Sequence, residues 1–254
     1  MTILYKICLY EERLKKHGNC NISNSMRELV YTCLSTVLEQ MSDQDEIVFF
    51  SDGIDGHENL KTLCNFYSKN YKLLTFNHKS ASKINYEVTK YINSNETQEQ
   101  IYICEDDYLH FDYALNKIKE FLIKYPNYFC HPIDYPNLYE IDSRFIYDSQ
   151  IILTNTHHWR SIKNTTYTIA LTKSLYNKHI RTFNIINDYV YDEHGINLLY
   201  VFNKCFSPMP SLSSHLTNGC FPYTLDTKSI FNEKYYLLSK KHFFNELQDF
   251  HSKI

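Results

Sequence analysis

Apolar and polar residues along the first half of the chain follow two alternating patterns. Short apolar runs, typical of buried strands, occupy residues 5–10, 46–51, 72–76 and 100–104. The stretches between them place apolar residues three and four positions apart, which predicts helices over residues 26–41, 59–69 and 80–92. Ser25 and Glu28 form a capping-box pattern at the first of these helices. A further helix is expected to begin at Asp112 and to end before Pro126.

This alternation of strands and helices is typical of an α/β fold, in which helices cover both faces of a mostly parallel sheet. Ligands of such folds bind beyond the carboxyl ends of the strands. Residues 10–13, 51–53, 77–78 and 105–107 each follow one of the predicted strands. We therefore expect these segments to converge at one edge of the sheet.

The second half of the chain has a less regular pattern. Residues 131–172 mix short apolar runs with polar and aromatic stretches, and residues 206–225, which contain three prolines, are predicted to form a loop. Helices are expected within residues 188–203 and over residues 232–250. No repeat, low-complexity tract or linker separates two cores, so residues 1–254 are expected to form one domain.

Composition and charge exclude several classes of protein. The formal net charge is −3, which gives no basic excess for binding nucleic acid. No apolar run approaches the roughly 18 residues of a transmembrane segment. The eight cysteines include no Cys-x-x-Cys pair, and Cys8, Cys33 and Cys104 stand in apolar runs that indicate burial. Since residues 1–10 also lack the pattern of a signal peptide, we expect a cytoplasmic protein.

Three adjacent acidic residues, Glu105, Asp106 and Asp107, follow the fourth predicted strand. Their mutual repulsion favours a divalent cation, and carboxylate oxygens suit Mg²⁺ or Mn²⁺. The alternative is a solvated acidic turn that caps the following helix. The apolar strand before the triplet, and its place in an alternating series, favour the metal site.

Here the sequence resembles the GT-A class of glycosyltransferases, and within it the family-2-like enzymes. The resemblance covers residues 1–125 in arrangement, with residues 101–107 similar to the DXD element of that class in an E-D-D form. It implies a GT-A (Rossmann-like) fold in which Asp107 binds Mn²⁺ or Mg²⁺. It also implies that Asp106 faces the ribose or a metal-bound water. A departure is that residues 78–82 lack the glycines often found in the matching loop.

The same resemblance divides the chain into a nucleotide-sugar-binding half, residues 1–125, and an acceptor-binding half, residues 126–254. In the first half it implies nucleotide contacts at the end of the first strand, beyond the second strand and in the acidic triplet: Tyr10, Glu11, Arg13, Asp52, Glu105 and Asp106.

The second half offers candidates for catalysis and for completing the metal site. Asp192 and Glu193 stand near the start of a predicted helix, where family-2-like enzymes place a catalytic base, and where an ionised carboxylate is favoured. Plain helix capping by Asp192 is the alternative, and Asp188 is a weaker candidate for the base. His215 is a candidate second metal ligand, because several GT-A enzymes use a late histidine, although a lone loop histidine is usually a surface residue.

Two neighbouring residues could contact the substrates. Arg160 could pair with phosphate through its planar guanidinium. Trp159 could stack on a sugar face. Packing within a loop is the alternative for both residues.

The sequence therefore predicts a metal-dependent glycosyltransferase of the hexosyltransferase type. It would use a UDP- or GDP-linked sugar and a glycan or other hydroxyl acceptor, and the resemblance implies inversion at the anomeric carbon. A nucleotidyltransferase acting on sugar phosphates is the closest alternative, but that class usually has a glycine-rich loop after the first strand, and here no glycine precedes Gly18. A non-catalytic sugar-binding module is a third possibility.

Overall fold

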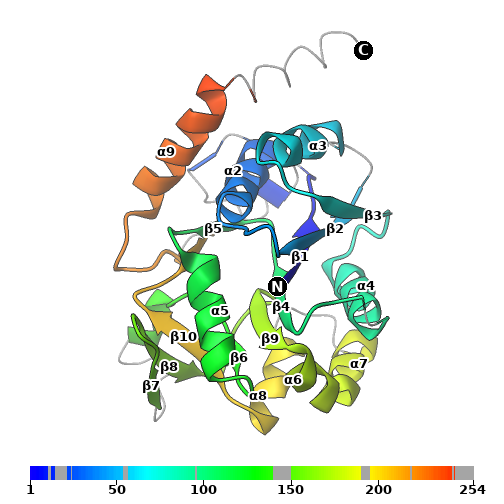
Figure 1. The fold of residues 1–254 in the computed structure, drawn as a ribbon, viewed down its shortest axis with the longest axis vertical. Helices are drawn as coiled ribbons and strands as arrows, with labels where there is room; N and C mark the ends of the chain where they lie inside the picture. The colour runs from blue at the N-terminus through cyan, green and yellow to red at the C-terminus, as the bar shows by residue number, and fades with distance from the viewer. Residues whose placement is uncertain are drawn as a thin grey trace.

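The computed structural model describes residues 1–10, 13–14, 22–23, 25–53, 57–94, 96–139, 150–189, 195–217, 219–241 and 243. Its centre is a nine-stranded mixed sheet with the strand order β3-β2-β1-β4-β9-β6-β10-β8-β7 (Figure 1). The strands are β1 (Thr2–Ile7), β2 (Glu46–Asp52), β3 (Tyr71–Phe76), β4 (Gln100–Cys104), β6 (Phe129–Cys130), β7 (Ile151–Leu153), β8 (His158–Ile162), β9 (Ile169–Thr172) and β10 (Cys205–Met209). The α/β class predicted from the sequence is confirmed.

Strands β1 to β4 form the parallel part of the sheet. β1 pairs with β2 on one side and with β4 on the other, and β2 pairs with β3, all in parallel register. The chain therefore leaves β1 in one direction across the sheet and later returns to its other side. Such a reversal opens a crevice at the carboxyl ends of the central strands.

Two layers of helices cover the sheet, as Figure 1 shows. One layer contains α2 (Met26–Leu38), α3 (His57–Phe66), α5 (Ala114–Lys124) and α9 (Thr227–Lys240). The other contains α4 (Ala81–Asn93), α6 (Lys173–Lys178) and α7 (Ile180–Tyr189). Side chains of a strand alternate between its faces, so Ile3 and Tyr5 pack in the first layer and Leu4 packs in the second.

The second half of the chain extends the same sheet. β9 lies antiparallel to both β4 and β6, and β10 pairs with β6 and β8. The prediction of a loop over residues 206–225 was wrong in part, because β10 and the short strand β11 (Ser213–His215) fall within it. β11 pairs antiparallel with β5 (Tyr108–His110), which directly follows the acidic triplet. Such strands depend on partners far away in the chain, so the local pattern does not indicate them.

Three predicted helices differ from the structure. No continuous helix occupies residues 188–203: α7 ends at Tyr189, residues 190–194 lie outside the described residues, and the short helices η2 (Gly195–Leu198) and α8 (Leu199–Phe202) follow. Asp112 does not cap α5, whose N-cap is Tyr113 in the left-handed conformation at φ 65°. α9 begins five residues earlier than expected, where the side chain of Asp226 accepts a hydrogen bond from the backbone N–H of Ser229.

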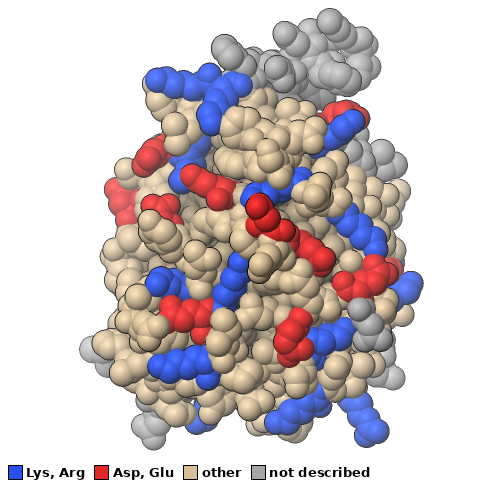
Figure 2. All heavy atoms as spheres, in the orientation of Figure 1, with Lys and Arg blue, Asp and Glu red and all other residues tan. Residues whose placement is uncertain are grey.

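The cysteines, the helices and the molecular surface add three observations. No disulfide joins the cysteines of the described residues; Cys33 and Cys104 are buried as predicted, whereas Cys8 is half-buried. Within the described part of the chain, none of the helices has the length and apolar character that crossing a membrane requires. On the face drawn in Figure 2, acidic and basic side chains are intermixed over the whole surface.

We predict that Phe121 is a major contributor to the stability of the fold. Its buried ring lies 4.4 Å from the ring of Trp159 between their centroids and also contacts Phe206. Replacing Phe121 with Ala should lower the free energy of unfolding by about 3–5 kcal/mol, because a cavity remains. Denaturant unfolding followed by the fluorescence of Trp159, the only tryptophan, measures this loss.

The matched control lies on the same helix. Ile123 is 75% exposed, so Ile123→Ala should change the free energy of unfolding by less than about 0.5 kcal/mol. Equal losses in the two variants would contradict the assignment of Phe121 to the core.

Candidate functional site

A cavity of about 340 Å³ opens at the carboxyl ends of β1, β2 and β4. It lies where the reversal of strand order around β1 opens a crevice. The structure brings together in its walls most of the residues predicted from the sequence for the nucleotide and the metal: Tyr10, Arg13, Asp52, Glu105, Asp106, Asp107 and His215.

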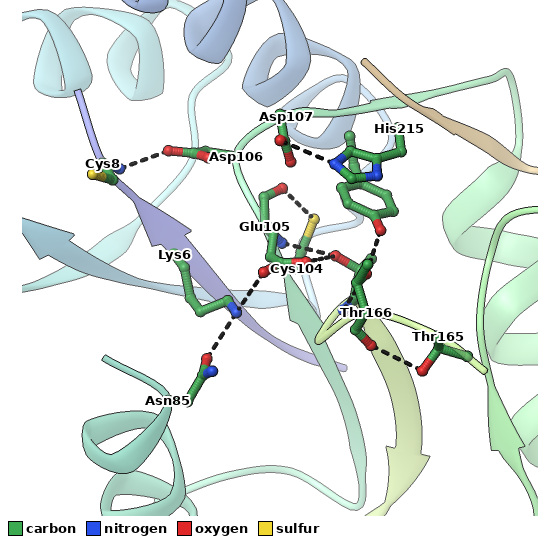
Figure 3. A network of polar contacts seen from close by, with 12 residues as sticks. Lys6, Cys8, Asn85, Cys104, Glu105, Asp106, Asp107, Thr165, Thr166 and His215 are labelled. Atoms are coloured by element: carbon green, nitrogen blue, oxygen red, sulfur yellow. Dashed lines mark hydrogen bonds and ion pairs between the residues drawn. The ribbon is translucent and has the colours of Figure 1, made fainter. Parts of the chain in front are cut away.

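Asp106 is the most deeply buried carboxylate of the acidic triplet, and it is held by the guanidinium of Arg13. Two Arg13 nitrogens lie 2.9–3.0 Å from the Asp106 oxygens. The backbone N–H of Cys8 donates to Asp106 Oδ2 at 2.6 Å, a contact drawn in Figure 3. Burial raises the pKa of Asp106, and the charge of Arg13 opposes this rise. With these bonds, Asp106 joins β1 to the loop after β4.

Glu105 is paired with a lysine from β1. The Lys6 ammonium donates to Glu105 Oε1 at 3.1 Å and to Asn85 Oδ1 at 2.8 Å, and it lies 5.0 Å from the centroid of the Tyr167 ring. The hydroxyl of Thr168 donates to the other carboxylate oxygen of Glu105 at 3.3 Å. Lys6 thus connects four segments of the cavity wall.

Asp107 faces the imidazole of His215, whose Nε2 lies 3.1 Å from Asp107 Oδ2. The pairing of β5 with β11 places the histidine here, because it aligns His215 with Tyr108, and the two rings stack with centroids 4.8 Å apart. Burial alone would lower the pKa of His215, but the neighbouring Asp107 carboxylate outweighs burial and holds that pKa well above 6.5.

Each of the three adjacent carboxylates therefore has its own cationic partner. Figure 3 shows Lys6 beside Glu105 and His215 beside Asp107, on either side of the loop that follows β4. Arg13 completes the set through Asp106. Basic side chains thus flank the acidic triplet, in place of the open acidic cluster that the sequence suggests.

The donor atoms of Asp107 and His215 fit a divalent ion. An octahedral ion with bonds of about 2.1 Å separates neighbouring ligands by about 3 Å, and the two facing atoms are 3.1 Å apart. Within the described residues, no group of three or more His, Cys, Asp or Glu side chains could hold a metal. The described residues would thus supply two ligands, as is usual where nucleotide phosphates and water supply the rest.

Asp52 has a role in the architecture of the cavity that the sequence did not indicate. Its carboxylate accepts hydrogen bonds from the backbone N–H groups of His78, Lys79 and Ser80 at 2.8–3.0 Å. These bonds fix the loop between β3 and α4 against the end of β2. Tyr10 lies over the next residue, Gly53, where an added Cβ would come within 3.3 Å of the Tyr10 hydroxyl.

Several predicted residues do not reach this cavity. Trp159 is 0% exposed and donates from Nε1 to the Thr154 hydroxyl, so stacking on a sugar is wrong for this residue. Arg160 pairs with the buried Asp134 at 2.7 Å and does not line the cavity. Strand β8 explains both positions, since its alternate residues face the core.

Three predicted residues, Glu11, Asp192 and Glu193, lie outside the described residues. Conversely, sequence reasoning missed Lys6 and Asn85. A signal for Lys6 was available, because it is the one charged residue in the otherwise apolar run that became β1. Asn85 had no such signal, since it lies among ordinary polar positions of a helix.

The fold is that of the GT-A glycosyltransferases. No model of a known protein family matches the sequence, and neither does any curated protein. Among solved structures, the fold is similar to that of S. aureus TarS 1-349, with a TM-score of 0.52, 10% identity, and coverage of 92% of this chain and 62% of that one.

Two further structures are similar and contain ligands. GalNAc-T7 with UDP, GalNAc and Mn²⁺ gives a TM-score of 0.53 at 10% identity, over 84% of this chain and 43% of that one. TarS 1-349 in complex with UDP-GlcNAc gives 0.51 at 10% identity, over 85% and 60%. The chain spans less than two thirds of each of these structures.

We predict that Arg13 stabilises the fold through Asp106. Arg13→Met leaves a buried carboxylate without its partner, which should lower the free energy of unfolding by about 3–5 kcal/mol. Asp106→Asn in the Arg13→Met background should recover part of that loss, because the uncompensated charge is gone. Urea unfolding of both variants, without nucleotide, measures the two values. A double variant no more stable than Arg13→Met would contradict the pairing.

Proposed function

We propose that this chain transfers a sugar from a UDP- or GDP-linked donor to an acceptor hydroxyl, in an inverting reaction that depends on Mn²⁺ or Mg²⁺. The observation that supports this most strongly is the Asp107–His215 pair, which lies at the end of β4 in a cavity of a GT-A fold. The TarS structure with UDP-GlcNAc and the GalNAc-T7 structure with UDP and Mn²⁺ support the donor class and the metal.

In this proposal the nucleotide extends across the cavity from the end of β2 to the acidic triplet. Tyr10 provides an aromatic surface for the nucleoside, and Asp52 fixes the loop of residues 78–80 in the cavity wall. The diphosphate lies next to Asp107 and His215. Glu105 and Asp106, held by Lys6 and Arg13, form the wall between the two ends.

Asp107 and His215 would hold the divalent ion, which when bound offsets negative charge on the diphosphate as a Lewis acid. The bond between the anomeric carbon and the diphosphate oxygen breaks, and its electron pair leaves with the diphosphate. A bond forms between that carbon and the acceptor oxygen on the opposite face. Asp192 or Glu193 takes the proton of the acceptor hydroxyl.

The two alternative functions make different demands on ligands. A non-catalytic sugar-binding module needs no nucleotide, so calorimetry with UDP, GDP and Mn²⁺ separates it from the proposal. A nucleotidyltransferase would join a sugar phosphate to a nucleotide and release pyrophosphate. A screen of nucleotide sugars for release of the nucleoside diphosphate separates that reaction from glycosyl transfer.

Asp107→Ala should abolish metal-dependent nucleotide binding. Because one of two protein ligands is lost, the affinity for UDP or GDP in Mn²⁺ should fall at least about 100-fold. Titration calorimetry with and without chelator measures the change. Asp112→Asn, which changes an exposed acid on the far side of β5, is the control and should behave as the parent. Unchanged metal dependence in Asp107→Ala would exclude this residue as a ligand.

Asp192→Asn and Glu193→Gln test the general base. One of them should reduce turnover by about 10²–10⁴-fold, because the base acts on the acceptor, while nucleotide affinity and melting temperature stay unchanged. A helix cap would instead cost roughly 1 kcal/mol of stability with turnover retained. Turnover is followed as release of the nucleoside diphosphate. If both variants keep near-normal turnover, the base lies elsewhere, and Asp188→Asn is the next variant to measure.

A further inference from the structure

The cations that line the cavity differ in whether they have a counter-ion. Lys6 pairs with Glu105 at 3.1 Å, and His215 faces Asp107 at 3.1 Å. Arg13 pairs with Asp106 at 2.9 Å and lies 3.9 Å from Asp107. Lys79 also lines the cavity, but within the described residues its ammonium forms no ion pair. Lys79 is therefore a cation of the described cavity wall whose ammonium forms no ion pair there, although the Asp52 carboxylate accepts a hydrogen bond from its backbone N–H.

The carboxylate of Asp52 fixes the backbone around Lys79. Asp52 accepts hydrogen bonds from the N–H groups of Lys79 and of the residues on either side, at 2.8–3.0 Å. Lys79 itself adopts φ +50°, in the left-handed region where glycine is the usual residue. A non-glycine residue is strained in that region, and the hydrogen bonds to the Asp52 carboxylate hold Lys79 in this conformation.

We propose that Lys79 binds the negatively charged phosphates of the nucleotide in this cavity, an inference that rests on the proposed function. Lys6 and Arg13 already pair with carboxylates of the acidic triplet, so their charges offer the phosphates little net attraction. A nucleoside diphosphate carries about three negative charges, because its terminal phosphate has a second pKa of about 6. One divalent ion offsets two of them. Lys79 supplies the next positive charge.

By the same charge count, Lys79 binds the sugar-linked donor and the released diphosphate with different strength. In a sugar-linked diphosphate the terminal oxygen is esterified, so about one negative charge is missing until the glycosidic bond breaks. A cation near the phosphates therefore binds the released diphosphate more strongly than the donor. Such a group favours departure of the leaving group, because it interacts most with the charge that develops during the reaction.

The test measures two kinds of ligand, a nucleoside diphosphate and the matching nucleoside, with four variants of the protein. Lys79→Gly and Lys79→Asn remove the charge and suit the left-handed backbone, whereas Lys79→Arg keeps the charge. Lys83→Gln removes a charge from an exposed position on α4 that does not line the cavity. Calorimetry in Mn²⁺ measures the affinities for UDP and uridine, and for GDP and guanosine, at low and high NaCl.

We expect both neutral variants at position 79 to bind the diphosphate about tenfold more weakly at low salt. The nucleoside affinity should stay unchanged, and the loss should shrink as salt screens the charge. Lys79→Arg and Lys83→Gln should remain within about twofold of the parent.

Three results would overturn the inference, and one of them also ends the proposed function. Equal losses for diphosphate and nucleoside would show that the loop contacts the base. If the diphosphate affinity is the same in Lys79→Gly, Lys79→Asn and Lys83→Gln, the Lys79 ammonium stays in solvent and does not bind the phosphates. Both of these leave nucleotide binding by the parent intact. If the parent binds neither UDP nor GDP with Mn²⁺ or Mg²⁺, the proposed function fails as well.

Discussion

The crowding of three adjacent carboxylates, two of them buried, at the end of a central strand is the constraint on which the candidate site depends. Glu105, Asp106 and Asp107 repel one another, and removing each from water costs free energy unless a cation accompanies it. The fold meets this demand with cations from separate parts of the chain. Lys6 comes from β1, and His215 comes from β11, 108 residues beyond its partner. The electrostatics of the triplet therefore tie β1, β4 and β11 to one another.

This pairing changes how a metal and a nucleotide would enter the site. In an open acidic cluster, a cation enters mainly to relieve repulsion. Here the repulsion is already offset, and an ion at Asp107 would take the place of its contact with His215. Metal affinity then depends on what else arrives with the ion, and phosphate oxygens are the natural additional ligands. For the same reason, the positive charge of Lys79 in the cavity wall matters more for binding the phosphates.

Residue type without context was a poor guide in the second half of the chain. Trp159 and Arg160 have the chemistry of sugar and phosphate contacts, but both belong to β8, where one is in the core and the other forms an ion pair with Asp134. Asp52 is the converse case. It stands where a nucleotide contact was expected, yet its carboxylate accepts three backbone hydrogen bonds and builds the loop that carries Lys79.

The sequence by itself determined the α/β class, β1 to β4, and the position of the acidic triplet after a buried strand, because these follow from local periodicity. The resemblance to GT-A enzymes also indicated His215 as a second metal ligand beside Asp107. Only the tertiary structure decided that β9 inserts between β4 and β6, that β5 pairs with β11, and that Lys6 faces Glu105. These are pairings between segments that are far apart in the chain. Their free energy comes from burial and charge across the sheet, and a local pattern of residues carries no information about either.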